Sequence, residues 1–450
     1  MARIAPFKGV LYNSQIIDNL SQVVTPPYDV INPQEQQRYY SLHPYNIIRL
    51  DFGRNFPSDT TEDNRYTRAA RIKTIWEKEQ ILIQDPEPAI YLYKILYRFS
   101  GKDLRIRTGF ICLLGLEPLN AGKVRPHEKT FSAHRHDRYQ LFQHSQMQFC
   151  PIFSFYLDKE NRILSQLSSQ APSEPFIDFQ DEQSIQHQLW RITDSAVLKK
   201  VQELFLEKTV YIADGHHRYE TSLAYQADQF RRHPNLQSNS ALNYTLMFLC
   251  PMEDQGLTIF PVHRALNRVS EIEPSQLEEI LEEDFSIEKF PFNAGNKKQI
   301  REQFLHQLEI RGKGGHVFGL FMARTSWYYL LTLKETSLNG PFGEDLHPLL
   351  RQLDVMILSR LIIQKGCNVQ REELDQENII EYRHDSLESL NLVEKGKSQI
   401  CFILNSTPID QVRQIAEASL VMPRKSTYFY PKTLTGLVMN RLNLDEFIQS

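Results

Sequence analysis

The sequence has almost no excess of charge of either sign. Its 450 residues include 51 Lys and Arg and 55 Asp and Glu, which leaves a formal net charge of −4. A protein that grips nucleic acid through the phosphate backbone usually presents a basic excess. The charge balance therefore argues against a nucleic-acid partner and favours a small-molecule substrate.

Long apolar runs and paired cysteines are also missing. No stretch of 18 or more apolar residues occurs, and Met1–Val10 lacks the apolar segment of a signal peptide, so we expect neither a membrane span nor secretion. The five cysteines stand singly without a CxxC pair, which excludes a zinc ribbon and fits reduced thiols in the cytoplasm. The sequence leaves the oligomeric state open.

What is present is the composition of a globular protein. Hydrophobic residues make up 41% of the sequence and charged residues 24%. A length of 450 residues predicts two or three domains. Hydrophobic periodicity predicts an α+β fold. Helices are expected at 34–42, 64–78, 133–144, 274–284, 297–310, 346–363 and 409–419. Strands are expected at 47–50, 89–99, 105–114, 244–250, 316–322, 327–334 and 399–404, with a hairpin turn at Ser100–Asp103.

The stretch TVYIADGHHRYETSLAYQADQFRR, residues 209–232, carries the strongest functional pattern. It begins with the alternation of a strand, breaks at Asp214-Gly215, and resumes with the apolar spacing of a helix of about 14 residues. The turn places His216, His217 and Arg218 beside the unpaired backbone donors of a helix N-terminus, where phosphate binds readily. The alternative is a structural turn in which Asp214 only caps the helix.

Two further places hold candidate site residues. His127 and Glu128 lie in a polar loop before a helix, where Glu128 is suited to act as a general acid or base. A solvated loop is the alternative. His263 and Arg264 stand at a strand end and form a second-rank candidate pair.

The segment MPRKSTYFYPK, residues 422–432, gathers cations and hydroxyls, namely Arg424, Lys425, Ser426, Thr427 and Lys432. Lys-Ser-Thr is typical of a P-loop, but the glycines that a P-loop needs are missing. Closely spaced cations repel unless they share an anion, so we expect a phosphate or carboxylate contact here. We also expect Lys425 and Lys432 to face the same pocket as His216 and Arg218, because a nucleotide with Mg²⁺ leaves more negative charge than one Arg and a helix dipole can neutralise. A polar rim with aromatic packing is the alternative.

No metal-ligating set is predicted. In the helix at 133–144, His134, His136, Asp137 and His144 lack the i, i+4 spacing of a zinc pair. Mg²⁺ carried in by a nucleotide needs only one or two carboxylates, and it remains compatible with the sequence.

Eight blocks run through the chain in order, namely MARIAPFKGVLYN (1–13), VVTPPYDVI (23–31), HPYNIIRLDFG (43–53), PHEKTF (126–131), DRYQLF (137–142), PIFSFY (151–156), YIADGHHRYETSLAY (211–225) and MPRKSTYFYPKTLTGLVMNRL (422–442). Through these blocks the chain resembles the domain-of-unknown-function 1015 family almost from end to end. The family is named for lacking a known function, so the resemblance does not by itself imply one.

The unit Leu189–Tyr225 is similar to the core of the ParB and sulfiredoxin superfamily. That core binds nucleotide phosphates with a helix, a strand and a Gly-x-x-Arg turn, which Gly215 and Arg218 match here. The superfamily includes free serine kinases, which move phosphate between an adenine nucleotide and the amino acid. Sulfiredoxins have a Cys where this chain has His216, so the resemblance does not imply thiol repair chemistry.

These patterns predict three parts. Residues 1–184 form a mixed α+β N-terminal part, 185–268 a ParB-like phosphate-binding core, and 269–450 an α+β C-terminal part that folds back on the core.

The resemblance to free serine kinases implies a phosphotransferase that uses ATP or ADP with Mg²⁺ and acts on a small hydroxyl metabolite such as serine or phosphoserine. The expected nucleotide-binding residues are Gly215, Arg218, Arg264, Lys425, Ser426, Thr427 and Lys432. The expected catalytic residues are Glu128, Asp214, His216 and His217, with Glu128 or Asp214 as the base. The alternative is a nucleotide-binding regulatory protein of ParB-like type without turnover.

Overall fold

The structure is a computed structural model of the chain. It describes residues 2–99, 103–119, 122–128, 132–237, 239–267, 273–340, 342–370, 373–374, 379–444 and 446–448. The chain mixes helices and strands in several sheets and divides into two compact units. Unit 1 comprises Met1–Leu257 and Pro431–Ser450, and unit 2 comprises Thr258–Tyr430.

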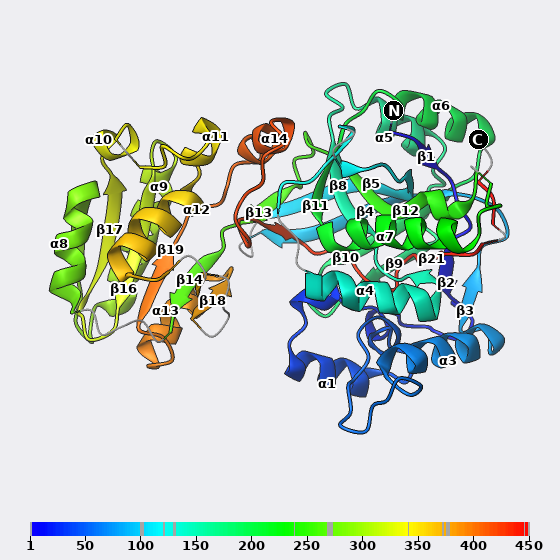
Figure 1. Cartoon of the computed structure of the whole chain (residues 1–450), viewed down its shortest axis with the longest axis horizontal. Helices are drawn as coiled ribbons and strands as arrows, with labels where there is room; N and C mark the ends of the chain where they lie inside the picture. The colour runs from blue at the N-terminus through cyan, green and yellow to red at the C-terminus, as the bar shows by residue number, and fades with distance from the viewer. Residues whose placement is uncertain are drawn as a thin grey trace. The chain divides into compact units, whose positions relative to one another are not determined.

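Unit 1 is built on a nine-stranded mixed sheet (Figure 1). The strands follow the order β6 (Val124–Arg125), β11 (Val210–Asp214), β8 (Ile152–Tyr156), β12 (Tyr244–Pro251), β5 (Asp103–Gly115), β4 (Ile90–Phe99), β10 (Gln186–Ile192) and β9 (Ile177–Gln180). β1 (Ile4–Ala5) pairs with β5 off this path. The pairs β6–β11 and β8–β12 are parallel, and the others are antiparallel. Strand β11, which leads into the candidate site, therefore lies next to the edge strand β6.

Helices cover this sheet and extend it into a small helical subdomain. α5 (Arg162–Ser169) and α6 (Ser195–Phe205) bury apolar side chains against strand residues such as Leu92, Phe110 and Ile152. α7 (His216–Arg232) follows β11 and packs on α4 (Ser132–Ser145). The subdomain contains α1 (Pro33–Leu42), α2 (Ile48–Asp51), α3 (Arg65–Lys78) and the strand pairs β2 (Val10–Tyr12) with β3 (Leu82–Gln84) and β7 (Met147–Gln148) with β21 (Asn440–Arg441).

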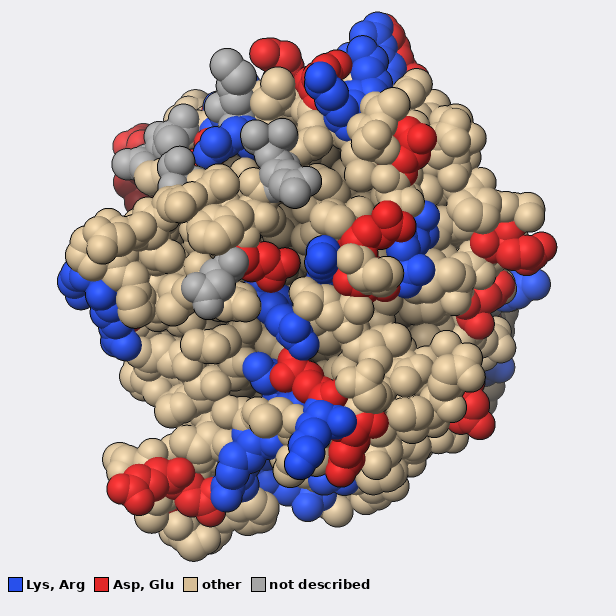
Figure 2. Space-filling model, turned by 90° about the vertical axis from the view of Figure 1, so that its right-hand side faces the viewer, with Lys and Arg blue, Asp and Glu red and all other residues tan. Residues whose placement is uncertain are grey.

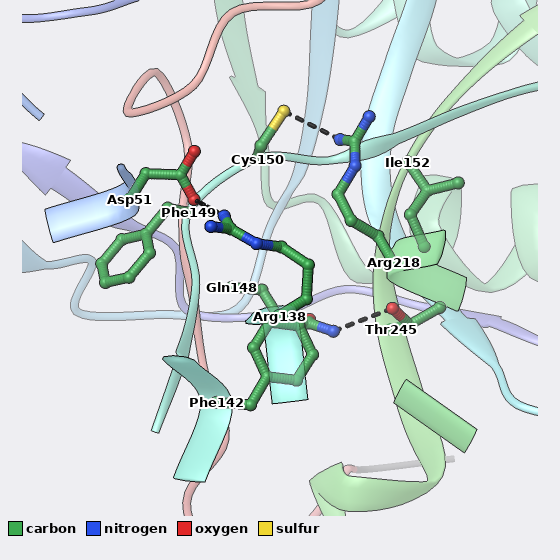
Figure 3. A pocket seen from close by; sticks show the side chains of 9 residues that line it. All are labelled: Asp51, Arg138, Phe142, Gln148, Phe149, Cys150, Ile152, Arg218 and Thr245. Atoms are coloured by element: carbon green, nitrogen blue, oxygen red, sulfur yellow. Dashed lines mark hydrogen bonds and ion pairs between the residues drawn. The ribbon is translucent and has the colours of Figure 1, made fainter. Parts of the chain in front are cut away.

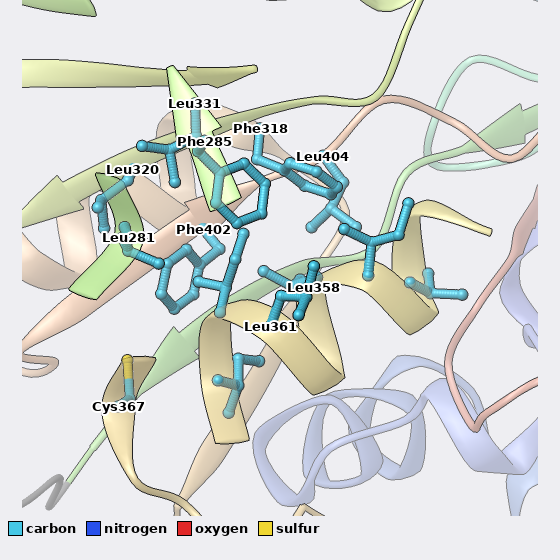
Figure 4. Close-up of a cluster of buried hydrophobic side chains, with 14 of the residues drawn as sticks. Leu281, Phe285, Phe318, Leu320, Leu331, Leu358, Leu361, Cys367, Phe402 and Leu404 are labelled. Carbon is cyan, nitrogen blue, oxygen red and sulfur yellow. The ribbon is translucent and has the colours of Figure 1, made fainter. Parts of the chain in front are cut away.

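Unit 2 contains a six-stranded antiparallel sheet. Its order is β15 (Phe285–Pro291), β17 (Trp327–Leu333), β16 (Val317–Met322), β19 (Ile400–Ile403), β14 (His263–Leu266) and β18 (Ile380–Arg383). α8 (Pro274–Asp284) and η5 (Leu358–Gly366) pack on one face, where Leu281, Phe318, Leu358 and Phe402 meet (Figure 4). α9 (Lys297–Gly312) and α13 (Ser386–Glu394) pack residues such as Phe304 and Leu390 on a second cluster. The sheet is thus covered on both faces.

Most of the expected elements are found, among them the helices at 34–42, 64–78, 274–284 and 409–419. The expected strand at 47–50 is wrong: Ile48–Asp51 is a helical turn, because the side chain of Asn46 accepts the backbone N–H of Ile48 at 3.0 Å. The expected helix at 346–363 is broken into α11 (Pro348–Arg351), α12 (Asp354–Ile357) and the π-helix η5. Leu353, fully buried, is extended between the first two, so core packing overrides the helical pattern.

The structure bears on two further expectations, the hairpin and the first domain boundary. The proposed hairpin is present as the antiparallel pair β4–β5, but its turn at 100–102 lies outside the described residues. The predicted boundary near residue 184 separates β9 from β10, which are paired strands of one sheet. Residues 431–450 return to unit 1.

The surface of the protein carries charges of both signs. On the face drawn in Figure 2, Lys and Arg side chains lie among Asp and Glu side chains rather than in one broad area of a single sign. No helix within the described ranges is long and apolar enough to cross a membrane. The five cysteines are buried and free.

We predict that unit 2 folds as an isolated fragment, residues 258–430. The ends of the fragment are adjacent because β13 (Thr258–Phe260) pairs with β20 (Tyr428–Tyr430), Thr258 opposite Tyr430, and its core is its own. Urea unfolding followed by circular dichroism should give one cooperative transition. A matched fragment, 269–450, lacks β14, which lies between β18 and β19, and should show none. Equal behaviour of the two fragments would contradict the division.

Candidate functional site

The candidate site is organised around the turn between β11 and α7. Gly215 adopts φ = +96°, a left-handed conformation that side chains disfavour, and it is the N-cap of α7. The guanidinium of Arg218 folds back over it, since a Cβ at position 215 would lie 2.8 Å from that group. As the N-cap residue, Gly215 makes no side-chain capping hydrogen bond. The turn therefore requires glycine at a position where other residues would cap the first backbone N–H groups of the helix.

Asp214, the last residue of β11, is shared by two cations. Its Oδ2 accepts Arg218 Nη2 at 3.0 Å, and its Oδ1 accepts Lys432 Nζ at 3.0 Å. Burial by itself would raise the pKa of the Asp214 carboxyl, but the charges of Lys432 and Arg218 outweigh it and hold the pKa well below its usual range. Asp214 is therefore an ionised carboxylate at neutral pH.

The other edge of the Arg218 guanidinium is also held by hydrogen bonds. Its Nη1 donates to the sulfur of Cys150 at 2.8 Å and to the carbonyl of Pro151 at 2.5 Å. Burial raises the pKa of the Cys150 thiol to about 11, so the sulfur is neutral. With its partners on both edges, the guanidinium is held in one orientation.

A small cavity lies beside Arg218 (Figure 3). It is lined by Asp51, Arg138, Phe142, Gln148, Phe149, Cys150, Ile152, Arg218 and Thr245. Its volume of about 10 Å³ is enough for roughly one water molecule. The cavity is an internal polar pocket behind the turn and is too small for a metabolite.

Arg138, from α4, is the second buried cation at this cavity. It pairs with Asp51 at 2.9 Å and with Asp137 at 2.6 Å, and its guanidinium carbon lies 3.9 Å from the ring centre of Tyr28. Burial raises the pKa of Asp51 despite the opposing charge of Arg138. This network fastens the Pro-Pro-Tyr-Asp segment and α2 to α4. Sequence reasoning missed it, although Arg138 and Asp51 both lie in blocks that carry the family resemblance.

Two histidines meet beside the turn. His127 Nδ1 lies 2.6 Å from the carbonyl of Ile212, and the backbone N–H of His127 donates to Nε2 of His216 at 3.3 Å. Burial lowers the pKa of His127 to about 4. Burial and the neighbouring His127 hold the pKa of His216 well below its usual value. Both imidazoles are neutral at pH 7, and they offer hydrogen bonds rather than charge.

The remaining predicted residues are distributed over both units. Glu128 and His217 are half-buried in unit 1, near His127 and His216 in sequence, whereas Lys129–Phe131 lie outside the described residues. Lys432 Nζ lies 3.0 Å from Asp214 Oδ1, and the expectation that it shares a pocket with His216 and Arg218 stays a prediction. The residues Arg264, Lys425, Ser426 and Thr427 belong to unit 2, and the expectation that Lys425 faces the same pocket stays a prediction.

In unit 2, Arg264 and Ser426 make contacts within that unit. Arg264 is buried, donates to the carbonyl of Val262 at 3.1 Å and lies over the ring of Tyr382. Ser426 is buried and donates to the carbonyl of Pro423 at 2.6 Å. Lys425 has φ = 53° in a turn. Within the described part of the chain, no group of three His, Cys, Asp or Glu side chains is arranged to hold a metal ion.

The buried histidines predict a loss of stability in acid. The unfolded chain takes up a proton on His127 near its ordinary pKa of 6.5, whereas the folded protein does so only near 4. The free energy of unfolding should therefore fall as the pH drops from 6.5 to 4, by up to about 3 kcal/mol for this residue. Urea unfolding at pH 7 and pH 4.5 measures it.

His127→Asn keeps a donor for Ile212 and removes the titration, so this variant should lose less stability between the two pH values. His233→Asn, at an exposed histidine after α7, is the control and should behave as the parent. An unchanged pH dependence in His127→Asn would contradict the assignment.

Solved structures offer only remote likenesses. Free serine kinase in complex with AMP is 12% identical, with 72% of this chain and 90% of that chain covered and a TM-score of 0.33. C-terminally truncated SbnI from Staphylococcus aureus is 9% identical, with 72% and 85% covered and a TM-score of 0.33. A conserved hypothetical protein from Pyrococcus furiosus is 12% identical, with 71% and 92% covered, at 0.33. Scores this low carry no argument about function.

Sequence comparison identifies a family but no curated relative. No curated protein sequence matches this one. The profile of one family, described as "Protein of unknown function (DUF1015)", matches residues 4–356. Since this match spans well over half of the chain, the protein belongs to the DUF1015 family.

Proposed function

We propose that unit 1 binds the phosphates of an adenine nucleotide at the N-terminus of α7 and transfers a phosphoryl group between the nucleotide and a small hydroxyl metabolite. Free serine or phosphoserine is the most specific candidate, following the resemblance of Leu189–Tyr225 to the ParB and sulfiredoxin core. The observation that carries the proposal is the convergence of Gly215, Arg218 and Lys432 at the N-terminus of α7.

The contacts of the turn suit this task. The backbone donors of α7 and Lys432 would bind phosphate oxygens, since the Lys432 side chain is 11% exposed and its ammonium group lies at the turn, 3.0 Å from Asp214 Oδ1. Arg218, fixed by Cys150 and Pro151, would position Asp214 rather than move. Asp214 is ionised, so it fits the role of carboxylate ligand for the Mg²⁺ that accompanies a nucleotide. The ion would neutralise phosphate charge.

The protonation states favour Glu128 as the general base. The pKa of Asp214 is held low by two cations, which makes this carboxylate a weak proton acceptor. His127 and His216 are neutral, and the backbone N–H of His127 donates to the His216 ring, so they serve as orienting groups. Glu128 follows His127 directly and is half-buried. A hydroxyl group bound beside this loop would give its proton to Glu128.

A nucleotide-binding regulatory protein without turnover is the second candidate. It is favoured by the internal pairing of Asp214 with Lys432 and Arg218, because a site with balanced charges can bind a ligand without performing chemistry. The two candidates agree on nucleotide binding and differ on phosphate transfer.

Nucleotide binding is tested by calorimetry with ATP, ADP and AMP, each with Mg²⁺. Lys432→Met should weaken the binding of ATP by about 10- to 150-fold, the range for a charged hydrogen bond of roughly 1.5 to 3 kcal/mol. Lys199→Met, at an exposed lysine on α6, removes the same charge elsewhere and should bind as the parent. No heat with any nucleotide at about 0.1 mM protein would end the proposal of a phosphate site.

Turnover is tested by phosphorus NMR on the protein with ATP or ADP, Mg²⁺ and serine, and in reverse from phosphoserine. Glu128→Gln should lower the transfer rate at least about 100-fold, as expected for loss of a general base, while nucleotide affinity stays within a few-fold of the parent. Binding without transfer to serine or to other hydroxyl amino acids would favour the regulatory alternative.

A further inference from the structure

A third buried cation of unit 1, Arg107, makes no hydrogen bond with its guanidinium group within the described part of the chain. Arg107, on β5, is 0% exposed, and its Nε, Nη1 and Nη2 atoms have no hydrogen-bond partner among the described residues. By contrast, the buried Arg138 and Arg218 are each paired with carboxylates. An isolated buried charge destabilises a fold unless an opposite charge or strong acceptors reach it. The arrangement around Arg107 is therefore incomplete.

The side chain of Arg107 extends across the sheet. β5 pairs with β12, which pairs with β8. The guanidinium carbon lies 5.5 Å from the ring centre of Phe248 on β12 and 4.7 Å from that of Phe153 on β8. It has thus reached the second strand from its own. The two rings are stacked 5.3 Å apart and form an aromatic floor beneath it.

The aromatic floor engages the flat face of the guanidinium, which leaves its N–H edge to other partners. Nearby polar groups are already committed. The hydroxyl of Tyr93 bonds His187 at 2.6 Å and that of Tyr97 donates to the Gly256 carbonyl at 2.8 Å. The Asp254 carboxylate accepts the backbone N–H groups of Thr108 and Gly256. What is missing is an acceptor that carries negative charge and matches a planar fork of donors.

We propose that Arg107 is the anchor of a second binding site in unit 1, which takes an oxyanion, the carboxylate or phosphate group of a small ligand, through paired hydrogen bonds to its N–H edge. Oxyanions match this fork bidentately. The site is separate from the α7 turn, because Asp214 binds Arg218 and Lys432 directly there, whereas the guanidinium of Arg107 makes no hydrogen bond with any described residue. It stands whether or not the turn binds a nucleotide.

The test measures thermal unfolding of the full chain at constant ionic strength, with chloride replaced by phosphate or by acetate. The midpoint should rise with at least one oxyanion in the parent protein and in Lys432→Met, and clearly less in Arg107→Met. Salts stabilise proteins generally, so the difference between variants is the readout. A response to phosphate alone or to acetate alone identifies the group. Without oxyanion, Arg107→Met should be at least as stable as the parent, since it removes a buried charge.

Equal responses of the parent protein and Arg107→Met would overturn the proposal, as would a phosphate response lost in Lys432→Met and kept in Arg107→Met. If Arg107→Met does not fold, crystals of the parent protein soaked in selenate decide the question. An anomalous peak within hydrogen-bond distance of Arg107 is expected, and Arg107→Lys should weaken it. Ordered water in place of selenate in the parent would overturn the proposal.

Discussion

The double ion pair of Asp214 is the interaction on which the candidate site depends. It joins three segments that are distant in sequence: the end of β11, the first turn of α7 and the C-terminal segment that carries Lys432. A carboxylate in this position would be costly to bury alone, and two cations would repel without it. Each charge at the turn is therefore tolerated because the other two are present.

A second layer holds this arrangement in place. Arg218 donates hydrogen bonds to Cys150 and Pro151. Arg138 forms ion pairs with Asp51 and Asp137, and both arginines line a cavity the size of about one water molecule. These groups are largely shielded from solvent, so their geometry is set by packing as well as by charge. A rigid second layer of this kind is what a precise binding site requires.

The sequence was informative where the pattern is local. The change from strand alternation to helical spacing at Asp214-Gly215 located the β11–α7 turn, and electrostatic reasoning brought Lys432 to it, although the anion that Lys432 meets is Asp214. Long-range features could not be read in the same way. The pairing of β13 with β20, which makes unit 2 an insertion in unit 1, joins residues far apart in the chain. The helical turn at Ile48 depends on the side chain of Asn46, and the break at Leu353 on burial. The burial of Arg107 left no such signal, because apolar residues occupy both phases of β5 beyond it and both are buried.

The insertion also sets an order of events during synthesis. A ribosome makes β11 and α7 long before it makes Lys432, and the whole of unit 2 lies between them. Until then, Asp214 has Arg218 but not its second cation, and β7 lacks its partner β21. Domains generally fold as units as they emerge. Here unit 2 is complete in the nascent chain before unit 1 is, so the site can close only after all of unit 2 has been synthesised and Lys432 has followed it.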